Sequence, residues 1–345
     1  MNYPQVTVYG YGYVGKALVD FLKSHYRLQV VDPLFNAGNL PDMPGVFCQN
    51  PSQAQKTKYA VVCVPTKMND DGTCDTSIVE DILKNTNHDF YLIKSTVIPG
   101  TTKKLTELTG KKIAFSPEYI GEGKYEIPFW LNFPHPTNMK LHSFHIFGGP
   151  KEVASEFVNL WQKVAGWSAT YQQTDSTTAE LVKYMENAFL ATKKIFCDEL
   201  YEIAKAFGVN YNELKELWLL DGRIGRAMTL IFPDSRGFGG KCLPKDVNAI
   251  VKAVEAVGYN SELLKQVLAS NKKFQALNMS EGTEDLKPGS EAGAEGAGEA
   301  AGAENAGEGS GEGQANTGEG SDAGASTDAS AGEGEGTGEG ETVSE

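Results

Sequence analysis

The most constraining feature of the sequence is a glycine turn between a short apolar run and an amphipathic segment. Residues 5–9 (QVTVY) lead into Gly10, Gly12 and Gly15, spaced as G-x-G-x-x-G, and an amphipathic pattern continues to residue 22. This order predicts a strand, a turn and a helix. The first glycine makes the turn, the second lets a pyrophosphate approach the backbone, and the third lets the helix pack on the strand. We therefore expect the helix N-terminus to face the phosphates of a bound dinucleotide.

A carboxylate follows at the position where the ribose of a dinucleotide is held. The apolar run 27–32 (RLQVVD) predicts a second buried strand, which ends at Asp32, 20 residues beyond Gly12. An acidic side chain there accepts hydrogen bonds from ribose hydroxyls and repels a 2′-phosphate. The sequence thus predicts NAD, rather than NADP, as the cofactor. A glycine turn in a sheet that binds no nucleotide is the alternative.

Further apolar runs indicate that the first part of the chain is an α/β domain. Helical patterns separate several of these runs, which cover residues 59–66, 90–96, 111–117 and 144–149. Strands that alternate with helices predict a parallel, doubly wound sheet. We expect this Rossmann-like, NAD-binding domain to occupy residues 1–149.

The second half of the chain has helical patterns. Residues 175–208 begin with polar residues and contain no glycine or proline before Gly208, which predicts a helix of about 30 residues. Its apolar residues form one stripe spaced by threes and fours: Met185, Phe189, Phe196, Leu200, Ile203 and Phe207. So long a helix is typical of a domain-spanning element or a dimer interface. We expect an all-helical central domain over residues 150–275 and a homodimer.

Three further helices are predicted in this central domain. The first covers residues 210–221, where Asn210 and Glu213 have the spacing of a capping box. Pro244 suits the first turn of a second helix that ends at Gly258. The third covers residues 261–274.

The remaining residues, 276–345, form a Gly/Glu/Ala-rich tail. From residue 281 onward there are 17 acidic residues and one lysine, a net charge of −16; against −14 for the whole chain, residues 1–280 carry +2. A segment with so few large apolar residues cannot offset its chain entropy, so we expect disorder. It is either a solvated spacer or the docking segment of an unidentified basic partner. The near-neutral remainder argues against nucleic acid as a partner.

The cysteines and apolar runs indicate the cellular compartment of the protein. Five cysteines occur with irregular spacing and without a CxxC motif, which favours a reducing compartment. The N-terminus shows no secretory leader, and the apolar runs are too short to span a membrane. We expect a cytoplasmic protein without a membrane partner.

A candidate reactive residue lies in the glycine-rich loop GFGGKCLPKD, residues 237–246. If Pro244 opens a helix, Cys242 lies just before the helix N-terminus, between Lys241 and Lys245. The helix dipole and both lysines favour a thiolate, and Asp246 follows one turn later. A structural loop cysteine is the alternative.

Other polar residues have the spacing of partners for this cysteine. Lys183 and Asn187, at i and i+4, share a helix face and could stabilise an oxyanion. Glu118 and Glu122 follow a predicted strand end, where one could act as a general base. Thr96 ends another strand and could contact substrate or nicotinamide. For the Lys/Asn and Glu/Glu pairs, the alternative is a solvated surface.

Seven motifs together resemble the UDP-glucose/GDP-mannose 6-dehydrogenase family, and UDP-glucose dehydrogenases are the nearest members. The motifs occur in the family's order between about residues 5 and 270: VYGYGYVG, VCVPT, KSTVIPGTT, SPEYIGEG, AELVKYMENAFLATKK, DGRIG and GFGGKCLPKD. The resemblance implies a four-electron oxidation of a sugar C6 alcohol to a carboxylate with two NAD. UDP-glucose would thus become UDP-glucuronate.

The resemblance also implies a role for each matched residue. Cys242 would form a thiohemiacetal and then a thioester, Lys183 and Asn187 would stabilise oxyanions, and Asp246, Glu118 and Thr96 would handle water and protons. The nucleotide sugar would contact Glu122, Lys245, Phe238, Gly239, Gly240 and Arg223, and the family pattern allows Arg223 to reach it across a dimer. NAD would be held by Gly10, Gly12, Tyr13, Val14, Gly15, Asp32, Pro65, Thr66 and Thr96.

Two parts of the chain depart from the family pattern. Family members continue into a third, α/β domain, whereas this chain changes to the Gly/Glu/Ala tail. Residues 125–149 replace a short Asn-Pro-Asp-Arg link and contain or adjoin His135, His142 and His145. No cysteine or carboxylate set completes a metal site with these histidines, so we expect none.

Two other functions fit parts of the pattern. A two-electron hydroxyacid dehydrogenase has a comparable Lys-x-x-x-Asn helix but needs no cysteine. A non-catalytic protein that binds NAD or a sugar is the other alternative. The presence of Cys242 in its loop favours the nucleotide-sugar 6-dehydrogenase.

Overall fold

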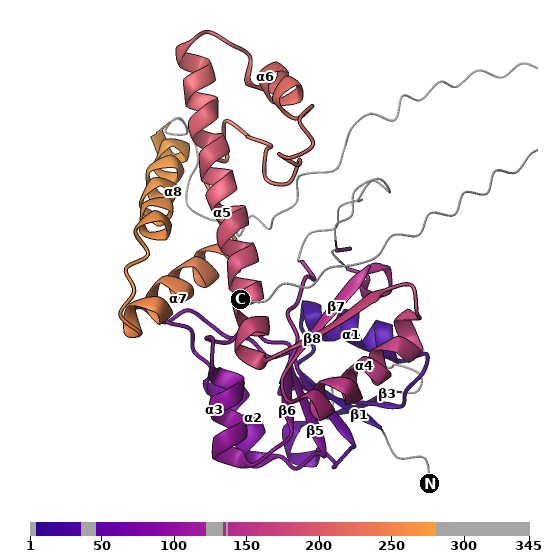
Figure 1. Ribbon diagram of the computed structural model, residues 1–345. Coiled ribbons are helices and arrows are strands. Elements are labelled where there is room, and N and C mark those ends of the chain that lie inside the picture. The colour runs from indigo at the N-terminus through magenta and orange to yellow at the C-terminus, as the bar shows by residue number, and fades with distance from the viewer. Residues whose placement is uncertain (1–4, 36–45, 122–133, 136, 281–345) are drawn as a thin grey trace, which may run out of the picture. The chain divides into compact units, whose positions relative to one another are not determined.

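The computed structural model describes residues 5–35, 46–121, 134–135 and 137–280. Glu122 and the predicted tail from residue 281 onward lie outside these ranges. The first part of the described chain forms an eight-stranded sheet in the order β3-β2-β1-β4-β5-β6-β7-β8 (Figure 1). Its strands are β1 (Val6–Tyr9), β2 (Leu28–Val31), β3 (Val46–Gln49), β4 (Tyr59–Val62), β5 (Phe90–Ile93), β6 (Ile113–Phe115), β7 (Phe144–Gly148) and β8 (Thr170–Thr174).

The sheet confirms the predicted α/β class. All neighbouring strands are parallel except β6 and β7, which pair antiparallel at Phe115 and Gly148. The sequence analysis did not predict β3 and β8, whose residues are mostly exposed or half-buried and lack a continuous apolar run. Because β8 pairs with β7, the sheet extends beyond residue 149, the predicted end of the first domain.

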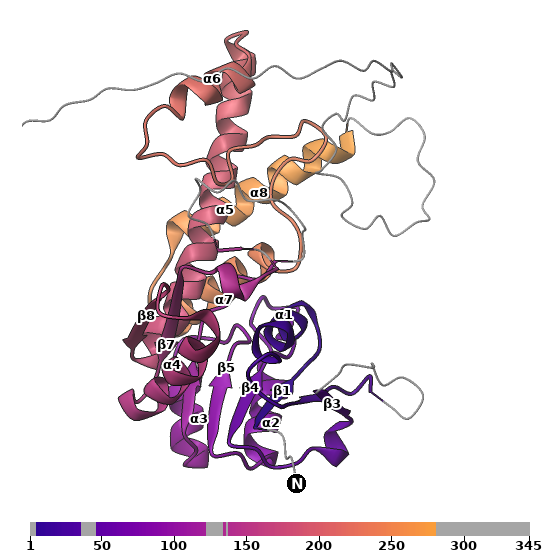
Figure 2. The same ribbon diagram turned by 90° about the vertical axis from the view of Figure 1, so that its right-hand side faces the viewer.

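Helices cover both faces of the sheet, as a doubly wound fold requires. One apolar cluster joins the sheet to α1 (Tyr13–Leu22) and α4 (Lys151–Ala165), with Phe21, Phe157 and Trp161 at its centre. A second cluster joins the other face to α2 (Ser77–Asn85) and α3 (Thr101–Thr109). The helices lie on both sides of the strands in Figure 2.

The predicted long helix is confirmed as α5 (Ser176–Ala206), which spans 31 residues. Asp175 caps its N-terminus by accepting a hydrogen bond from the Thr178 amide at 2.9 Å. Glu180, fully buried, accepts hydrogen bonds from the Gly100 and Thr102 amides at the start of α3. The first turns of α5 are therefore fixed to the sheet domain.

Three more helices follow α5. They are α6 (Tyr211–Trp218), capped by Asn210 as predicted, α7 (Leu243–Ala256) and α8 (Glu262–Ser280). An apolar cluster that contains Ala191, Val247 and Val267 joins α5, α7 and α8. The last helix runs five residues past residue 275, the predicted end of the domain. Within the described residues, no helix is long and apolar enough to cross a membrane.

Candidate active site

The glycine turn after β1 has the geometry that its spacing predicts. Gly10 has φ +91°, and a Cβ there would lie 2.6 Å from the Cys63 carbonyl oxygen at the end of β4. A Cβ on Gly15 would lie 2.1 Å from the Gly10 carbonyl oxygen. Both positions therefore exclude any side chain, and the turn lies between β1 and β4, where the strand order of the sheet reverses. Ligands of doubly wound sheets bind at such a point.

The turn leaves an open N-terminus on α1. Gly12 is the N-cap residue and provides no side-chain cap, and the space that its Cβ would fill is empty to 4 Å. Tyr13 and Val14 form the first helical turn, with Tyr13 exposed. Unsatisfied amides and open space at a helix N-terminus suit a pyrophosphate.

Asp32 joins the turn to the end of β2. Its Oδ2 accepts a hydrogen bond from the Tyr11 amide at 2.8 Å, and its Oδ1 accepts one from the Leu34 amide at 2.9 Å. A carboxylate has about four lone-pair sites, so it can still accept ribose hydroxyls. The residues of this turn thus fit a dinucleotide.

The neighbouring strand ends bring further predicted residues toward the same edge of the sheet. Pro65, exposed, and Thr66, buried, follow β4, and Thr96 follows β5. The Thr96 carbonyl accepts a hydrogen bond from Cys74 Sγ at 3.7 Å. Cys74 packs with Tyr184 of α5 and Ile250 of α7, which connects this strand edge to the helical domain.

The cysteine loop ends at the helix predicted for it. Cys242 is exposed and is the N-cap residue of α7, with Pro244 in the first turn. Asp246, one turn later, is 2% exposed and accepts a hydrogen bond from Asn187 Nδ2 at 2.5 Å. Lys245 binds the other carboxylate oxygen of Asp246. The structure thereby brings together three predicted residues from two distant segments.

Residues that the sequence analysis missed fix the start of this loop. Arg236 Nε donates to Asp198 Oδ1 at 2.7 Å, and the Gly237 amide donates to Asp198 Oδ2 at 2.9 Å. The Phe238 amide donates to Asn271 Oδ1 of α8 at 2.7 Å. Gly239 and Gly240 then leave the buried region and are exposed. No sequence signal indicated Asp198, which is fully buried and lies on another face of α5 than Phe196, a residue of the predicted stripe that is 50% exposed.

Glu118 lies at the end of β6 as a buried carboxylate. Its Oε2 lies 3.1 Å from Lys94 Nζ, and its Oε1 accepts hydrogen bonds from the Tyr119 and Ile120 amides. Burial alone would raise its pKa, but Lys94 and the two amides outweigh burial and hold the pKa below its ordinary value. Glu118 is thus an anion that can orient water or accept a hydrogen bond.

Lys183 faces the segment after β6. Its Nζ lies 5.3 Å from the centroid of the Tyr119 ring, a cation–π contact, and 3.9 Å from Glu186 Oε2. Glu186 was not predicted as a site residue, although it lies at i+3 from Lys183 and directly precedes Asn187.

Two predicted substrate residues are not brought to the site by the described chain. Arg223 is 88% exposed in its side chain and pairs with Asp221 in its own loop at 2.6 Å. Glu122 lies outside the described residues. The predicted contact of Arg223 across a dimer is not tested by a single chain.

The three histidines after residue 134 pack against aromatic rings and the backbone. His142 Nε2 hydrogen-bonds with the His135 carbonyl at 2.8 Å, and the His142 and His145 rings stack at 6.1 Å. Burial lowers the pKa of His145 to about 3. In the part of the chain that the structure describes, no group of three His, Cys, Asp or Glu residues could hold a metal ion.

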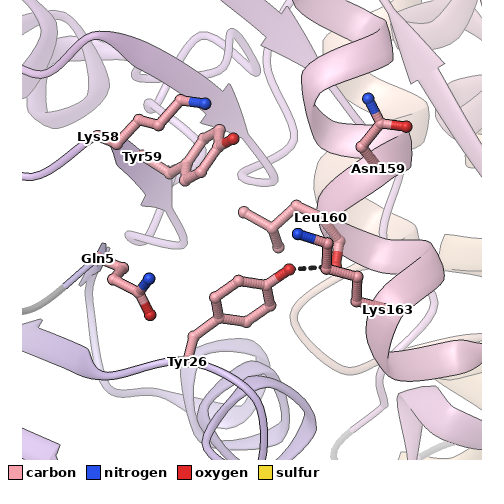
Figure 3. Close-up of a pocket in the computed structure, with 7 residues that line it drawn as sticks. All are labelled: Gln5, Tyr26, Lys58, Tyr59, Asn159, Leu160 and Lys163. Carbon is pink, nitrogen blue, oxygen red and sulfur yellow. Dashed lines mark hydrogen bonds between the residues drawn. The ribbon is translucent and has the colours of Figure 1, made fainter.

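A separate pocket lies at the opposite edge of the sheet. It measures about 430 Å³ and is lined by Gln5, Tyr26, Lys58, Tyr59, Asn159, Leu160 and Lys163 (Figure 3). Gln5 and Lys58 directly precede β1 and β4, so the pocket faces the amino ends of these strands. The predicted site residues follow the carboxyl ends, and none of them lines this pocket.

The chain is similar to several known proteins. Residues 177–273 match the central domain of the UDP-glucose/GDP-mannose dehydrogenase family. The UDP-glucose 6-dehydrogenase AglM of Haloferax volcanii is 31% identical over 234 residues, which are 62% of this chain and 52% of that protein. The chain thus spans about half the length of the curated relatives it matches.

Solved structures show the same fold. A UDP-glucose dehydrogenase from Pyrobaculum islandicum superposes with a TM-score of 0.64 at 26% identity, over 78% of this chain and 68% of that one. The 3-hydroxyisobutyrate dehydrogenase of Mycobacterium tuberculosis superposes with a TM-score of 0.55 over 81% of this chain and 99% of that one. At 15% identity, the second match concerns the fold alone.

Fold and site together define the class as a dinucleotide-binding sheet domain followed by a helical domain, as in the nucleotide-sugar dehydrogenases. Within that class, the chain resembles the UDP-glucose/GDP-mannose dehydrogenase family, most directly over its central domain. The resemblance predicted from the seven motifs is therefore confirmed.

Proposed function

We propose that this chain is an NAD-dependent nucleotide-sugar 6-dehydrogenase that oxidises UDP-glucose to UDP-glucuronate. The observation that carries the proposal is the Asn187–Asp246 hydrogen bond at 2.5 Å, one turn after the exposed Cys242. It joins the Lys-x-x-x-Asn helix to the cysteine loop. The cysteine loop is the motif that distinguishes the proposed family from two-electron hydroxyacid dehydrogenases, which share a comparable Lys-x-x-x-Asn helix.

NAD would be held by the glycine turn, Asp32, Pro65, Thr66 and Thr96, and would accept one hydride in each of two oxidations. In the first oxidation, the C6 hydroxyl would give its proton to water held by Glu118 and Asp246 while C6 gives a hydride to NAD, so that the alcohol becomes an aldehyde. Lys183 and Asn187 donate hydrogen bonds to the oxygen as negative charge develops there.

The Cys242 thiolate then forms a bond to the aldehyde carbon, and the oxygen takes a proton to give a thiohemiacetal. Loss of a hydride to a second NAD, and of a proton to the same water, would convert this adduct to a thioester. Water, oriented by Glu118 and Asp246 with Thr96, attacks the thioester carbon, and the C–S bond breaks. The products are a carboxylate and the regenerated thiol. The sugar nucleotide would contact Lys245, the loop from Phe238 to Gly240, Glu122 and Arg223.

The test is the number of NADH formed per sugar consumed, with purified full chain, NAD and UDP-glucose, and with GDP-mannose in parallel. We expect two NADH per sugar, and we expect the Cys242→Ser variant to lose this turnover. NAD binding without NADH from either sugar would contradict the proposed activity and favour a non-catalytic binding role.

A second candidate is a two-electron hydroxyacid dehydrogenase. It is favoured by one feature, the spacing of Lys183 and Asn187 on α5, which enzymes of that type share with the proposed family. One NADH per substrate and full activity of Cys242→Ala would support it, since a single hydride transfer needs no covalent adduct.

The same proposal includes a homodimer formed through α5. The predicted apolar stripe is largely uncovered in the single chain, with Phe189 67% and Phe207 80% exposed. Exposed apolar area of this kind is typical of an interface. Light scattering should give twice the chain mass of 37.3 kDa, and Phe189→Asp should give the monomer.

A further inference from the structure

We propose that Glu186 is a positioning residue, whose carboxylate holds the Lys183 ammonium in place at the candidate active site. The charge pair itself is independent of the proposed function, whereas its effect on turnover rests on that function. Lys183, Glu186 and Asn187 stand at i, i+3 and i+4 on α5 and so share one face of the helix.

The first observation concerns one oxygen of the Glu186 carboxylate. Glu186 Oε2 is buried, and within the described residues it accepts no hydrogen bond. A third of the side chain is exposed, so the buried oxygen is the part that points inward. The cation nearest to it is Lys183, with Nζ at 3.9 Å from Oε2. Leaving a buried carboxylate oxygen unmatched is unfavourable unless a charge compensates it.

The second observation is that Lys183 is restrained from two sides. Its Nζ lies 5.3 Å from the Tyr119 ring centroid, in addition to its contact with the carboxylate. An ammonium has three N–H donors. If one N–H group is directed at Glu186, two remain for the oxygen of a substrate. The carboxylate can therefore orient the Lys183 ammonium and leave it able to donate to the substrate.

The charged and titratable groups around Glu186 come from three parts of the chain. Lys183 lies on the same helix, Tyr119 and Glu118 follow β6, and Lys94, which pairs with Glu118, directly follows β5. Burial raises the pKa of Glu186, and Lys183 opposes this increase. Burial and the two carboxylates raise the pKa of Tyr119, so the phenol stays neutral. At pH values above the raised pKa of Glu186, its carboxylate is charged and holds the Lys183 ammonium. As the pH falls through this pKa, the carboxyl is protonated and the ammonium is released.

The pair can be tested without turnover. The full chain, labelled with ¹³C at glutamate carboxyl carbons, is titrated by NMR, and the Glu186 signal is the one missing from Glu186→Gln. We expect its midpoint to lie above the ordinary value of 4.5. Replacing the cation, in Lys183→Met, should move the midpoint further up, because the charge that opposes the effect of burial is lost. An unchanged midpoint in Lys183→Met would show that the two groups do not interact and would overturn the proposal.

The effect on catalysis is measured with Glu186→Gln and a matched control, Glu199→Gln, which alters an exposed glutamate of the same helix. We expect kcat of Glu186→Gln to fall about tenfold with little change in KM, because orientation of an oxyanion donor is lost. The acid limb of the kcat–pH profile should also change in Glu186→Gln alone. A purely structural role would lower thermal stability and leave this profile in place.

The outcomes separate the two proposals. If the wild-type chain oxidises no nucleotide sugar while its Glu186 midpoint still responds to Lys183→Met, this result would contradict the proposed function and support the interaction between Glu186 and Lys183. A wild-type chain that is active, with Glu186→Gln equal to it in kcat and pH profile, would keep the function and overturn Glu186 as a positioning residue.

Discussion

The two glycine loops of this chain both lead into a helix N-terminus, but they are held in different ways. The loop from Gly10 to Gly15 is fixed by backbone contacts with Cys63 and by Asp32, all at the carboxyl edge of adjacent strands. The loop from Gly237 to Cys242 is fixed by side chains of α5 and α8 that are 33 or more residues away in sequence.

The difference follows from the supports that each loop has. Parallel strands present a rigid edge, and a turn between them needs only close backbone approach. A loop between helices has no such edge, so buried side chains must satisfy its amides. Asp198, fully buried, accepts hydrogen bonds from Arg236, Gly237 and Lys194. We infer that close steric contact of the backbone fixes the first loop, whereas hydrogen bonds to buried charged and polar side chains fix the second.

The largest expected effect comes from removing that charge. Asp198→Asn leaves Arg236 and Lys194 buried without their common anion, and we expect a loss of about 3–5 kcal/mol of unfolding free energy. Urea unfolding measures the loss, and NAD affinity should be unchanged. Glu202→Gln, which alters the more exposed partner of Arg236, is the control and should cost less. Loss of NAD binding in Asp198→Asn would mean that the two loops are not independent.

Acid should weaken the sheet domain through its buried histidines. Burial lowers the pKa of His88 to about 4 and of His145 to about 3, whereas both have ordinary values of 6.5. Below pH 6.5 the unfolded chain therefore binds protons that the folded chain does not, and stability falls as the pH falls. At pH 5 we expect a loss of about 2 kcal/mol for each histidine.

Unfolding in urea at pH 7 and pH 5 measures this acid effect. His145→Phe should keep the stacked aromatic packing and reduce the difference between the two pH values. An equal difference in wild type and variant would show that His145 does not titrate in this way.

Steric change at the first loop should have a smaller but more specific effect. Gly15→Ala places a Cβ against the Gly10 carbonyl, so we expect a loss of about 1–3 kcal/mol together with loss of NAD binding. Gly12→Ala has space for its Cβ and should keep stability while it lowers NAD affinity. Calorimetric titration and urea unfolding separate the two effects. Equal stability of both variants would contradict the claim that close approach fixes this loop.

The smallest effect is expected at Asp32. Asp32→Asn retains one acceptor oxygen for the Tyr11 and Leu34 amides, so we expect a cost of about 1 kcal/mol and a moderate loss of NAD affinity. Asp20→Asn, at an exposed position on α1, serves as the control. Identical NAD affinity in Asp32→Asn would exclude a ribose contact.

Much of the fold could be predicted because its signals are local. The strand–turn–helix at Gly10 and the cap at Asn210 were each predicted from a short motif, and the long helix α5 from one continuous stretch of the chain. The edge strands β3 and β8 were not, since their pairing is decided by a neighbouring strand rather than by an apolar run. The antiparallel direction of β7 relative to β6 is likewise decided by the tertiary structure.

The candidate site divides in the same way. The residue types at Cys242, Asp246, Lys183 and Asn187 were evident from the sequence, because helix periodicity and a proline fix where each lies on its own helix. That these residues meet was not evident from the sequence, since Asn187 and Asp246 are 59 residues apart and touch only because α5 packs on α7.

The sequence by itself determined the local backbone of this protein: where strands end, where glycine is required and where helices begin. Steric and hydrogen-bonding limits act over a few residues, so a short motif carries them completely. The tertiary structure alone decided which charged groups share a buried space, as Asp198 of α5 with Arg236, 38 residues further along the chain. Such pairs depend on how helices pack, and burial and distance then set their electrostatics.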